Sequence, residues 1–161
     1  FREYVVTDQR GRQIARATSS WFVLDSARRR PARLPTQLST VEVPEHPRPF
    51  AADERERPPI VTDSEYKTII GVRRADLDLN GHANHGRFVE WATESVPPAY
   101  NQAHVCMAFD LFIEREIGFP HLVDVEAATR PGGWLHTVRR AGTVLARLTT
   151  RWVPFATAQA D

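Results

Sequence analysis

The chain has 161 residues, enough for one ordinary domain or slightly more, and its 42% hydrophobic and 25% charged residues suit a globular core. A formal net charge of +1 gives no electrostatic basis for binding nucleic acid, and no apolar run is long enough to span a membrane. Because the chain has a single cysteine, Cys106, and its first residues do not resemble a signal peptide, we expect a cytoplasmic protein without an intrachain disulfide.

The first predicted element, within residues 1–30, is a β-hairpin that recurs near the other end of the chain. Residues 11–21 (GRQIARATSSW) and residues 142–152 (GTVLARLTTRW) share Gly, Ala, Arg, Thr and Trp in register. A strand-like run precedes each glycine, REYVVTD in one case and WLHTVRR in the other, so both units are typical of hairpins that turn at the glycine. A match that includes both tryptophans indicates an internal duplication.

The duplication predicts how the chain is divided. Residues 1–30 would be the C-terminal hairpin of a first repeat whose earlier part is missing, and residues 65–154 would be a complete second repeat, followed by a tail at 155–161. Residues 31–64 are predicted to be a linker, because seven of the 12 prolines fall there and proline favours extended, irregular backbone. In the alternative interpretation, residues 1–27 form an extra hairpin packed on a single domain.

The second repeat is predicted to begin with a strand at residues 65–74, followed by a loop rich in Asp, Asn and Gly. A helix should begin near Asn84, a favourable N-cap residue. Apolar residues then recur at helical spacing from Phe88 through Trp91, and Pro97 should end the helix.

The remainder of the second repeat predicts an antiparallel sheet. In residues 103–118 apolar and polar side chains alternate, which places Met107 and Phe109 on the buried face and Cys106 and Glu116 on the other. Three more strands are expected at residues 121–129, 132–140 and 143–152. The fold class is therefore α+β, an antiparallel sheet wrapped around one long helix.

Asp78, Asn80 and His82 occupy alternate positions in the loop directly before the predicted helix. A helix N-terminus carries unpaired N–H groups and a partial positive charge, and such groups stabilise a developing oxyanion. His82 can transfer protons near neutral pH, and Asn80 can donate through its amide. The pattern favours hydrolysis of an ester or thioester, although the same residue types also form ordinary capping loops.

Two other chemistries are disfavoured by the same residues. A metal site could be built from Asp78, His82 and His85. Two histidines three residues apart are a weak signal, and no additional ligand has a spacing typical of a metal site, so we expect neither a metal nor a cofactor. Cys106 is expected to be a small packed residue rather than a nucleophile. His136 has no evident partner in the sequence and is expected to be a surface or strand residue.

The segment RRADLDLNGHANHGRFVEWATESVP (residues 73–97) resembles the signature of the acyl-acyl-carrier-protein (acyl-ACP) thioesterases, a hot-dog-fold family. That signature is Asp-Leu-Asp-x-Asn-x-His-x-Asn-Asn, followed by an aromatic helix that ends in Glu-Ser-x-Pro. LFIEREIG (residues 111–118) is similar to the family's strand ending in Arg-Arg-Glu-Cys-Gly, and residues 16–35 look like the end of its first hot-dog domain. The resemblance implies a double hot-dog fold, here with the first copy truncated at its N-terminus.

The resemblance assigns the family's catalytic positions to Asp78, Asn80, His82 and Glu116. It implies hydrolysis of the thioester between a fatty acyl chain and the phosphopantetheine of acyl carrier protein, the step that ends fatty acid synthesis. Ile117 stands where the family commonly has a cysteine, so no thiol acts there.

Two further functions are compatible with this pattern. Single-domain hot-dog relatives share the Asp and the Gly-His loop, which leaves an acyl-coenzyme A thioesterase as an alternative. A non-catalytic acyl-binding fragment is the other, because a missing first repeat would remove much of the acyl pocket. A homodimer is compatible with each of these functions.

Overall fold

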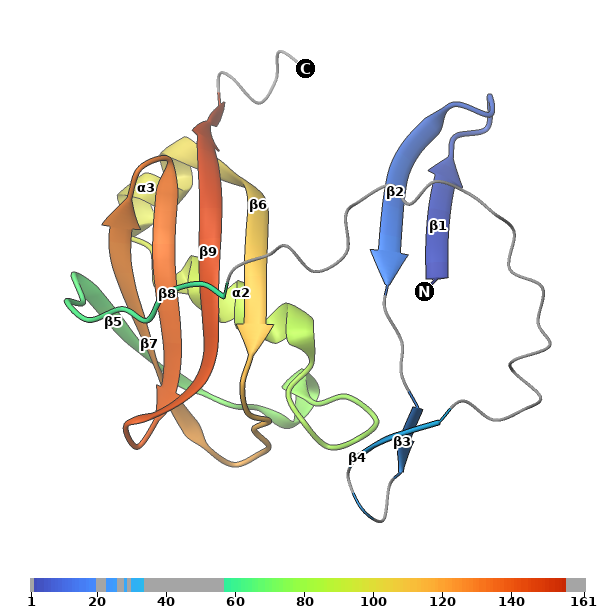
Figure 1. Cartoon of the computed structure of the whole chain (residues 1–161). Helices are drawn as coiled ribbons and strands as arrows, with labels where there is room; N and C mark the ends of the chain where they lie inside the picture. The colour runs from blue at the N-terminus through green and yellow to red at the C-terminus, as the bar shows by residue number, and fades with distance from the viewer. Residues whose placement is uncertain (1, 20–22, 26–27, 29, 34–56, 156–161) are drawn as a thin grey trace. The chain divides into compact units, whose positions relative to one another are not determined.

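A computed structural model of the chain describes residues 2–19, 23–25, 28, 30–33 and 57–155 (Figure 1). The chain divides into two compact units, Phe1–Arg55 and Glu56–Asp161, and the division falls inside the segment predicted to be a linker. Most of that predicted linker, the predicted tail beyond residue 155, and Trp21 of the repeated hairpin lie outside the described residues.

The described residues of the first unit form two pairs of antiparallel strands. Strands β1 (Arg2–Thr7) and β2 (Gln13–Ser19) form the hairpin expected around Gly11, whose φ of 76° is a left-handed conformation that favours glycine. Asp8 closes the turn, because its Oδ1 accepts hydrogen bonds from two backbone N–H groups of the turn. A shorter pair, β3 (Val23–Asp25) with β4 (Arg30–Ala32), was not expected from the sequence.

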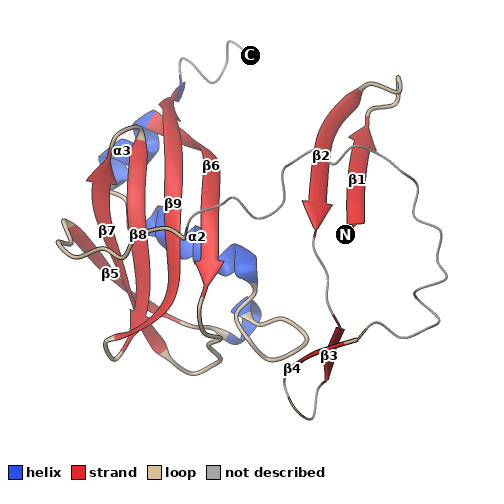
Figure 2. Cartoon of the chain, in the orientation of Figure 1, coloured by secondary structure: helices blue, strands red, loops and turns tan. Residues whose placement is uncertain are grey.

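The second unit is built on one five-stranded antiparallel sheet in the order β5-β7-β8-β9-β6 (Figure 2). The final hairpin turns at Ala141 and Gly142, both with positive φ. The strands are β5 (Tyr66–Gly71), β6 (His104–Ile113), β7 (Leu122–Arg130), β8 (Gly133–Arg140) and β9 (Thr143–Pro154). All five agree with the sequence prediction in type and order, so the expected α+β class is confirmed.

Two helices cover one face of this sheet. Helix α2 (His85–Glu94) begins after the expected N-cap Asn84, and its apolar stripe buries Phe88 and Trp91 against β6, β7, β8 and β9. The rings of these two residues pack with their centroids 5.0 Å apart. The prolines that end α2 also begin a second helix, α3 (Pro98–Ala103), which the sequence prediction missed. The helix predicted between Asn84 and Pro97 is therefore confirmed as α2, and α3 is an additional helix.

The alternation predicted for β6 is wrong in its first half, because the strand carries a β-bulge. Cys106 pairs with Trp152 and Ala108 pairs with Arg151, which leaves Met107 as the extra residue. Cys106 consequently packs beside the tryptophans of β8 and β9, whereas the side chain of Met107 is exposed. The bulge therefore reverses the faces assigned to Cys106 and Met107, although Cys106 is packed as expected. Phe109 was also predicted on the buried face, and its side chain is exposed.

His136 is a strand residue of β8, one of the two expected placements, and its side chain is fully buried in the core rather than on the surface. Its Nδ1 lies 3.1 Å from the hydroxyl of Ser95, and its Nε2 lies 2.9 Å from the hydroxyl of Thr150. The Ser95 hydroxyl donates to the carbonyl oxygen of Ala92, and Trp152 Nε1 donates to Thr150 Oγ1. This hydrogen-bond pattern assigns a neutral imidazole that donates from Nδ1 and accepts at Nε2. The side chain of His136 thereby connects the end of α2 to β9 from its own strand, β8.

Candidate active site

The loop before α2 is a compact turn organised by Asp78. Its Oδ1 accepts hydrogen bonds from the N–H groups of Asn80, at 2.8 Å, and His82, at 3.3 Å. The N–H of Asp78 donates to the carbonyl of His82 at 2.8 Å, which closes the turn, and Gly81 provides the positive φ of 78° that it requires. The backbone N–H of Asn80 contributes most to holding the pKa of Asp78 below its ordinary value. Asp78 therefore stabilises the loop as an ionised carboxylate.

His82 meets Glu116 across this loop. The Nε2 atom of His82 lies 3.5 Å from the Oε2 atom of Glu116. Their side chains are 39% and 54% exposed, so water can reach both groups. Strand β6 ends at Ile113, and Glu116 lies in the following loop, so the alternation of the strand does not determine where its side chain points. The structure thus brings together the histidine and the glutamate that the family resemblance selected.

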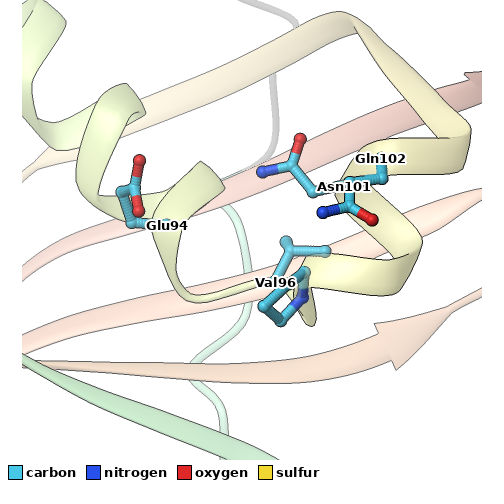
Figure 3. A pocket seen from close by; sticks show the side chains of 5 residues that line it. Glu94, Val96, Asn101 and Gln102 are labelled. Carbon is cyan, nitrogen blue, oxygen red and sulfur yellow. The ribbon is translucent and has the colours of Figure 1, made fainter.

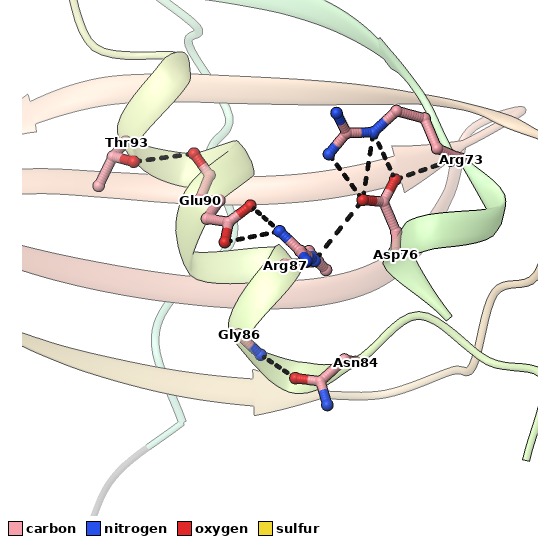
Figure 4. A network of polar contacts seen from close by, with 7 residues as sticks. All are labelled: Arg73, Asp76, Asn84, Gly86, Arg87, Glu90 and Thr93. Carbon is pink, nitrogen blue, oxygen red and sulfur yellow. Dashed lines mark hydrogen bonds and ion pairs between the residues drawn. The ribbon is translucent and has the colours of Figure 1, made fainter. Parts of the chain in front are cut away.

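Asp76, the other acidic residue of the Asp-Leu-Asp sequence, is buried in an ionic network (Figure 4). Arg73 donates to it from Nη2 at 2.8 Å and from its backbone N–H at 2.7 Å, and the Nε of Arg87 lies 3.6 Å away. The hydrogen bond from the Arg73 side chain is the main reason that the pKa of Asp76 is lowered. The carbonyl of Asp76 also accepts the N–H of Asn84 at 2.8 Å. Asp76 therefore fixes the loop to the start of α2, whereas Asp78 accepts the backbone N–H of His82.

The N-terminus of α2 is already capped. The side-chain Oδ1 of Asn84 accepts the N–H of Gly86 at 2.9 Å, and the carbonyl of Asn84 accepts the N–H of Arg87 at 2.9 Å. These two donors are satisfied within the cap, which limits the oxyanion role expected for the helix end. Asn80 is exposed in the loop, and its side-chain amide also hydrogen-bonds to Asp78 and helps to lower the pKa of that carboxyl. The amide has a second N–H, which can donate to another acceptor.

The only cysteine and a surface hollow both lie apart from this loop. Burial raises the pKa of the Cys106 thiol, which makes it a poor nucleophile. A hollow of about 220 Å³ at the other end of α2 is lined by Glu94, Val96, Pro98, Asn101 and Gln102, with polar side chains around it (Figure 3). Within the ranges given above, no three His, Cys, Asp or Glu side chains form a metal-binding group, and no helix is long and apolar enough to cross a membrane.

The five-stranded antiparallel sheet with α2 packed against it has the hot-dog fold of solved thioesterases. The 12:0-ACP thioesterase of Umbellularia californica superposes with a TM-score of 0.74 at 23% identity, and an acyl-ACP thioesterase of Bacteroides thetaiotaomicron with 0.72 at 19%. Each match covers 94% of this chain and 61% of the solved chain.

The chain belongs to the acyl-ACP thioesterase family, because residues 61–154 match the acyl-ACP thioesterase C-terminal domain. It is 29% identical over 133 residues to oleoyl-acyl carrier protein thioesterase 1 of Arabidopsis thaliana, covering 76% of this chain and 37% of the relative. It is 26% identical over 143 residues to a palmitoyl-acyl carrier protein thioesterase of Cuphea hookeriana, covering 82% of this chain and 33% of the relative. The matched part of the chain thus spans about a third of the length of these relatives.

Proposed function

We propose that this chain supplies the catalytic residues of a thioesterase that hydrolyses fatty acyl-ACP to a free fatty acid and acyl carrier protein, the step that ends fatty acid synthesis. The observation that carries the proposal is the pairing of His82 with Glu116 at 3.5 Å, on the domain that matches the family. The relatives named above act on acyl carrier protein thioesters, and this supports the same substrate class here.

In the proposed reaction, a water molecule attacks the thioester carbonyl carbon beside this pair. His82 and Glu116 together accept the proton that the water loses, because an imidazole and a carboxylate in contact share a proton readily. The amide of Asn80 donates to the carbonyl oxygen as it becomes negative. The carbon–sulfur bond then breaks, and the proton passes to the sulfur of the departing phosphopantetheine.

Asp78 contributes to this reaction by fixing the loop. Its carboxylate holds the backbone N–H groups of Asn80 and His82, so the donor amide and the histidine are presented in one rigid turn. A preorganised turn avoids the cost of ordering these groups when substrate binds.

We further infer that the β1–β2 hairpin closes a first hot-dog repeat of the same protein. Residues 11–21 and 142–152 share five residue types in register, and an antiparallel hairpin is present at both places. Both observations support this inference. The gene sequence upstream of Phe1 tests it. A second helix-bearing repeat is expected there, and its absence would favour the extra-hairpin alternative.

The substrate is tested by comparing acyl-ACP with acyl-coenzyme A of the same chain length, using the longest natural form of the protein. Release of free fatty acid, followed by mass spectrometry, should be faster with acyl-ACP at equal substrate concentration. Faster release from acyl-coenzyme A would favour that alternative activity. Binding of both substrates without release of fatty acid would identify an acyl-binding protein instead.

A further inference from the structure

The loop that carries Glu116 is anchored on both sides of that residue. Upstream, the N–H groups of Glu114 and Arg115 both donate to the carbonyl of Leu145, at 2.7 and 3.1 Å. Downstream, the carbonyl of Ile117 accepts the N–H of Ala83 at 2.8 Å, which ties this loop to the turn that contains His82. The position of Glu116 therefore depends on how closely the two loops approach each other.

Two glycines face each other where these loops meet. A Cβ atom placed on Gly118 would lie 3.1 Å from the carbonyl oxygen of Gly81, which is tighter than nine in ten real Cβ contacts. The atom that it would meet belongs to the backbone, so no flexible side chain can move aside. With any side chain at position 118, the backbone at Gly81 must therefore give by a few tenths of an ångström.

The two glycines are required for different physical reasons. Gly81 has a φ of +78°, but a Cβ there would meet nothing within 4 Å, so backbone conformation is the constraint. Gly118 has no such φ, so other residues can adopt its backbone conformation, and space alone is the constraint.

We propose that Gly118 is a positioning residue, whose missing side chain allows the two loops to close until Glu116 reaches His82. The inference rests on the proposed function and deepens it. The His82–Glu116 contact of 3.5 Å is already long for a hydrogen bond, so a further separation of a few tenths of an ångström weakens it directly. Because Ile117 is buried in the core beside Gly118, the displacement is passed to the exposed Glu116 rather than into the sheet.

The test uses Gly118→Ala and the bulkier Gly118→Val in the longest natural form of the protein. Gly71→Ala is the matched control, because its Cβ would lie an ordinary 3.7 Å from a side-chain atom of Leu122. Gly118→Ala should lower kcat on acyl-ACP about 10-fold with KM nearly unchanged, and Gly118→Val should lower kcat further, since misplacement of about 1 Å costs about 100-fold. Gly71→Ala should keep the kcat of the parent protein.

A double variant separates positioning from general damage. Added to Glu116→Gln, Gly118→Ala should cause no further loss of kcat, because both changes remove the same contact. Full additivity of the two losses, an unchanged kcat in Gly118→Ala alone, or failure of Gly118→Ala to fold would each overturn the proposal.

Amide hydrogen exchange provides a measurement that needs no catalysis. Exchange at Ala83, whose N–H donates to Ile117, should accelerate in Gly118→Ala and stay unchanged in Gly71→Ala. If the parent protein releases no fatty acid from any acyl thioester, the proposed function fails, yet this measurement still decides whether Gly118 holds the loops together. Unchanged exchange at Ala83 would overturn the positioning role.

Discussion

Acidification should destabilise the protein through His136, whose imidazole is neutral and fully buried. Both ring nitrogens are satisfied in the neutral form, by the hydroxyls of Ser95 and Thr150. Protonation adds a second N–H donor at Nε2, where Thr150 already directs its own hydroxyl hydrogen, and it places a charge in the core.

The magnitude follows from the pKa. Burial lowers the pKa of His136 from 6.5 to about 4, and each pKa unit corresponds to about 1.4 kcal/mol. Between these two values the unfolded chain binds a proton that the folded protein does not, so the free energy of unfolding falls as the pH falls. The contribution of neutral His136 to the free energy of unfolding is fully present above pH 6.5. About 3 kcal/mol of this contribution is lost when the pH falls to about 4.

Urea unfolding at pH 7.5 and 4.5, on the parent protein and on His136→Gln, measures this loss. Carboxylates titrate in both proteins, so the informative quantity is the difference between the two pH dependences. The parent should lose about 2 to 3 kcal/mol more than the variant, which has no group that titrates at this position. Equal losses in the two proteins would show that His136 is not held neutral in the core, and the reasoning would be refuted.

Three other predictions concern residues outside the proposed reaction. Trp91→Ala should lower the free energy of unfolding by about 3 to 5 kcal/mol, because Trp91 is buried in the core; a melting shift near zero would mean that the ring is exposed. Asp76→Asn should lower the free energy of unfolding, measured with urea, by about 1 to 3 kcal/mol, because it weakens a buried acceptor of Arg73. The control Glu94→Gln, at the exposed end of α2, should change this free energy by no more than about 0.5 kcal/mol. Cys106→Ala should keep kcat within about two-fold of the parent, because its buried thiol has a raised pKa; a large loss of turnover without unfolding would contradict this.

Local patterns in the sequence were sufficient for the five strands and for helix α2 of the second unit. The helix cap at Asn84 and the stripe through Trp91 are set by neighbours within two turns, and the structure confirms both. Helix α3 was missed because Pro97 and Pro98 were interpreted only as a stop, although proline is also favoured at the first position of a helix.

Non-local contacts account for what the sequence did not reveal. The bulge at Met107 depends on how β6 pairs with β9, and no residue type marks it. His136 finds its partners through the packing of α2 on the sheet, so its isolation in the sequence gave no hint of burial. The proximity of Glu116 to His82 was expected from the family resemblance alone, because alternation along β6 placed Glu116 on the solvent side.

Turnover of acyl-ACP by His82→Ala, in the longest natural form of the protein, tests the proposed function most directly. We expect kcat to fall about 100-fold or more, with KM and melting temperature nearly unchanged, because His82 is only partly buried and acts mainly in the transition state. His85→Asn is the matched control, since this exposed histidine stands three residues away, where the family signature has asparagine, and the variant should keep normal turnover. Near-normal turnover in His82→Ala, or unfolding of that variant, would contradict the account.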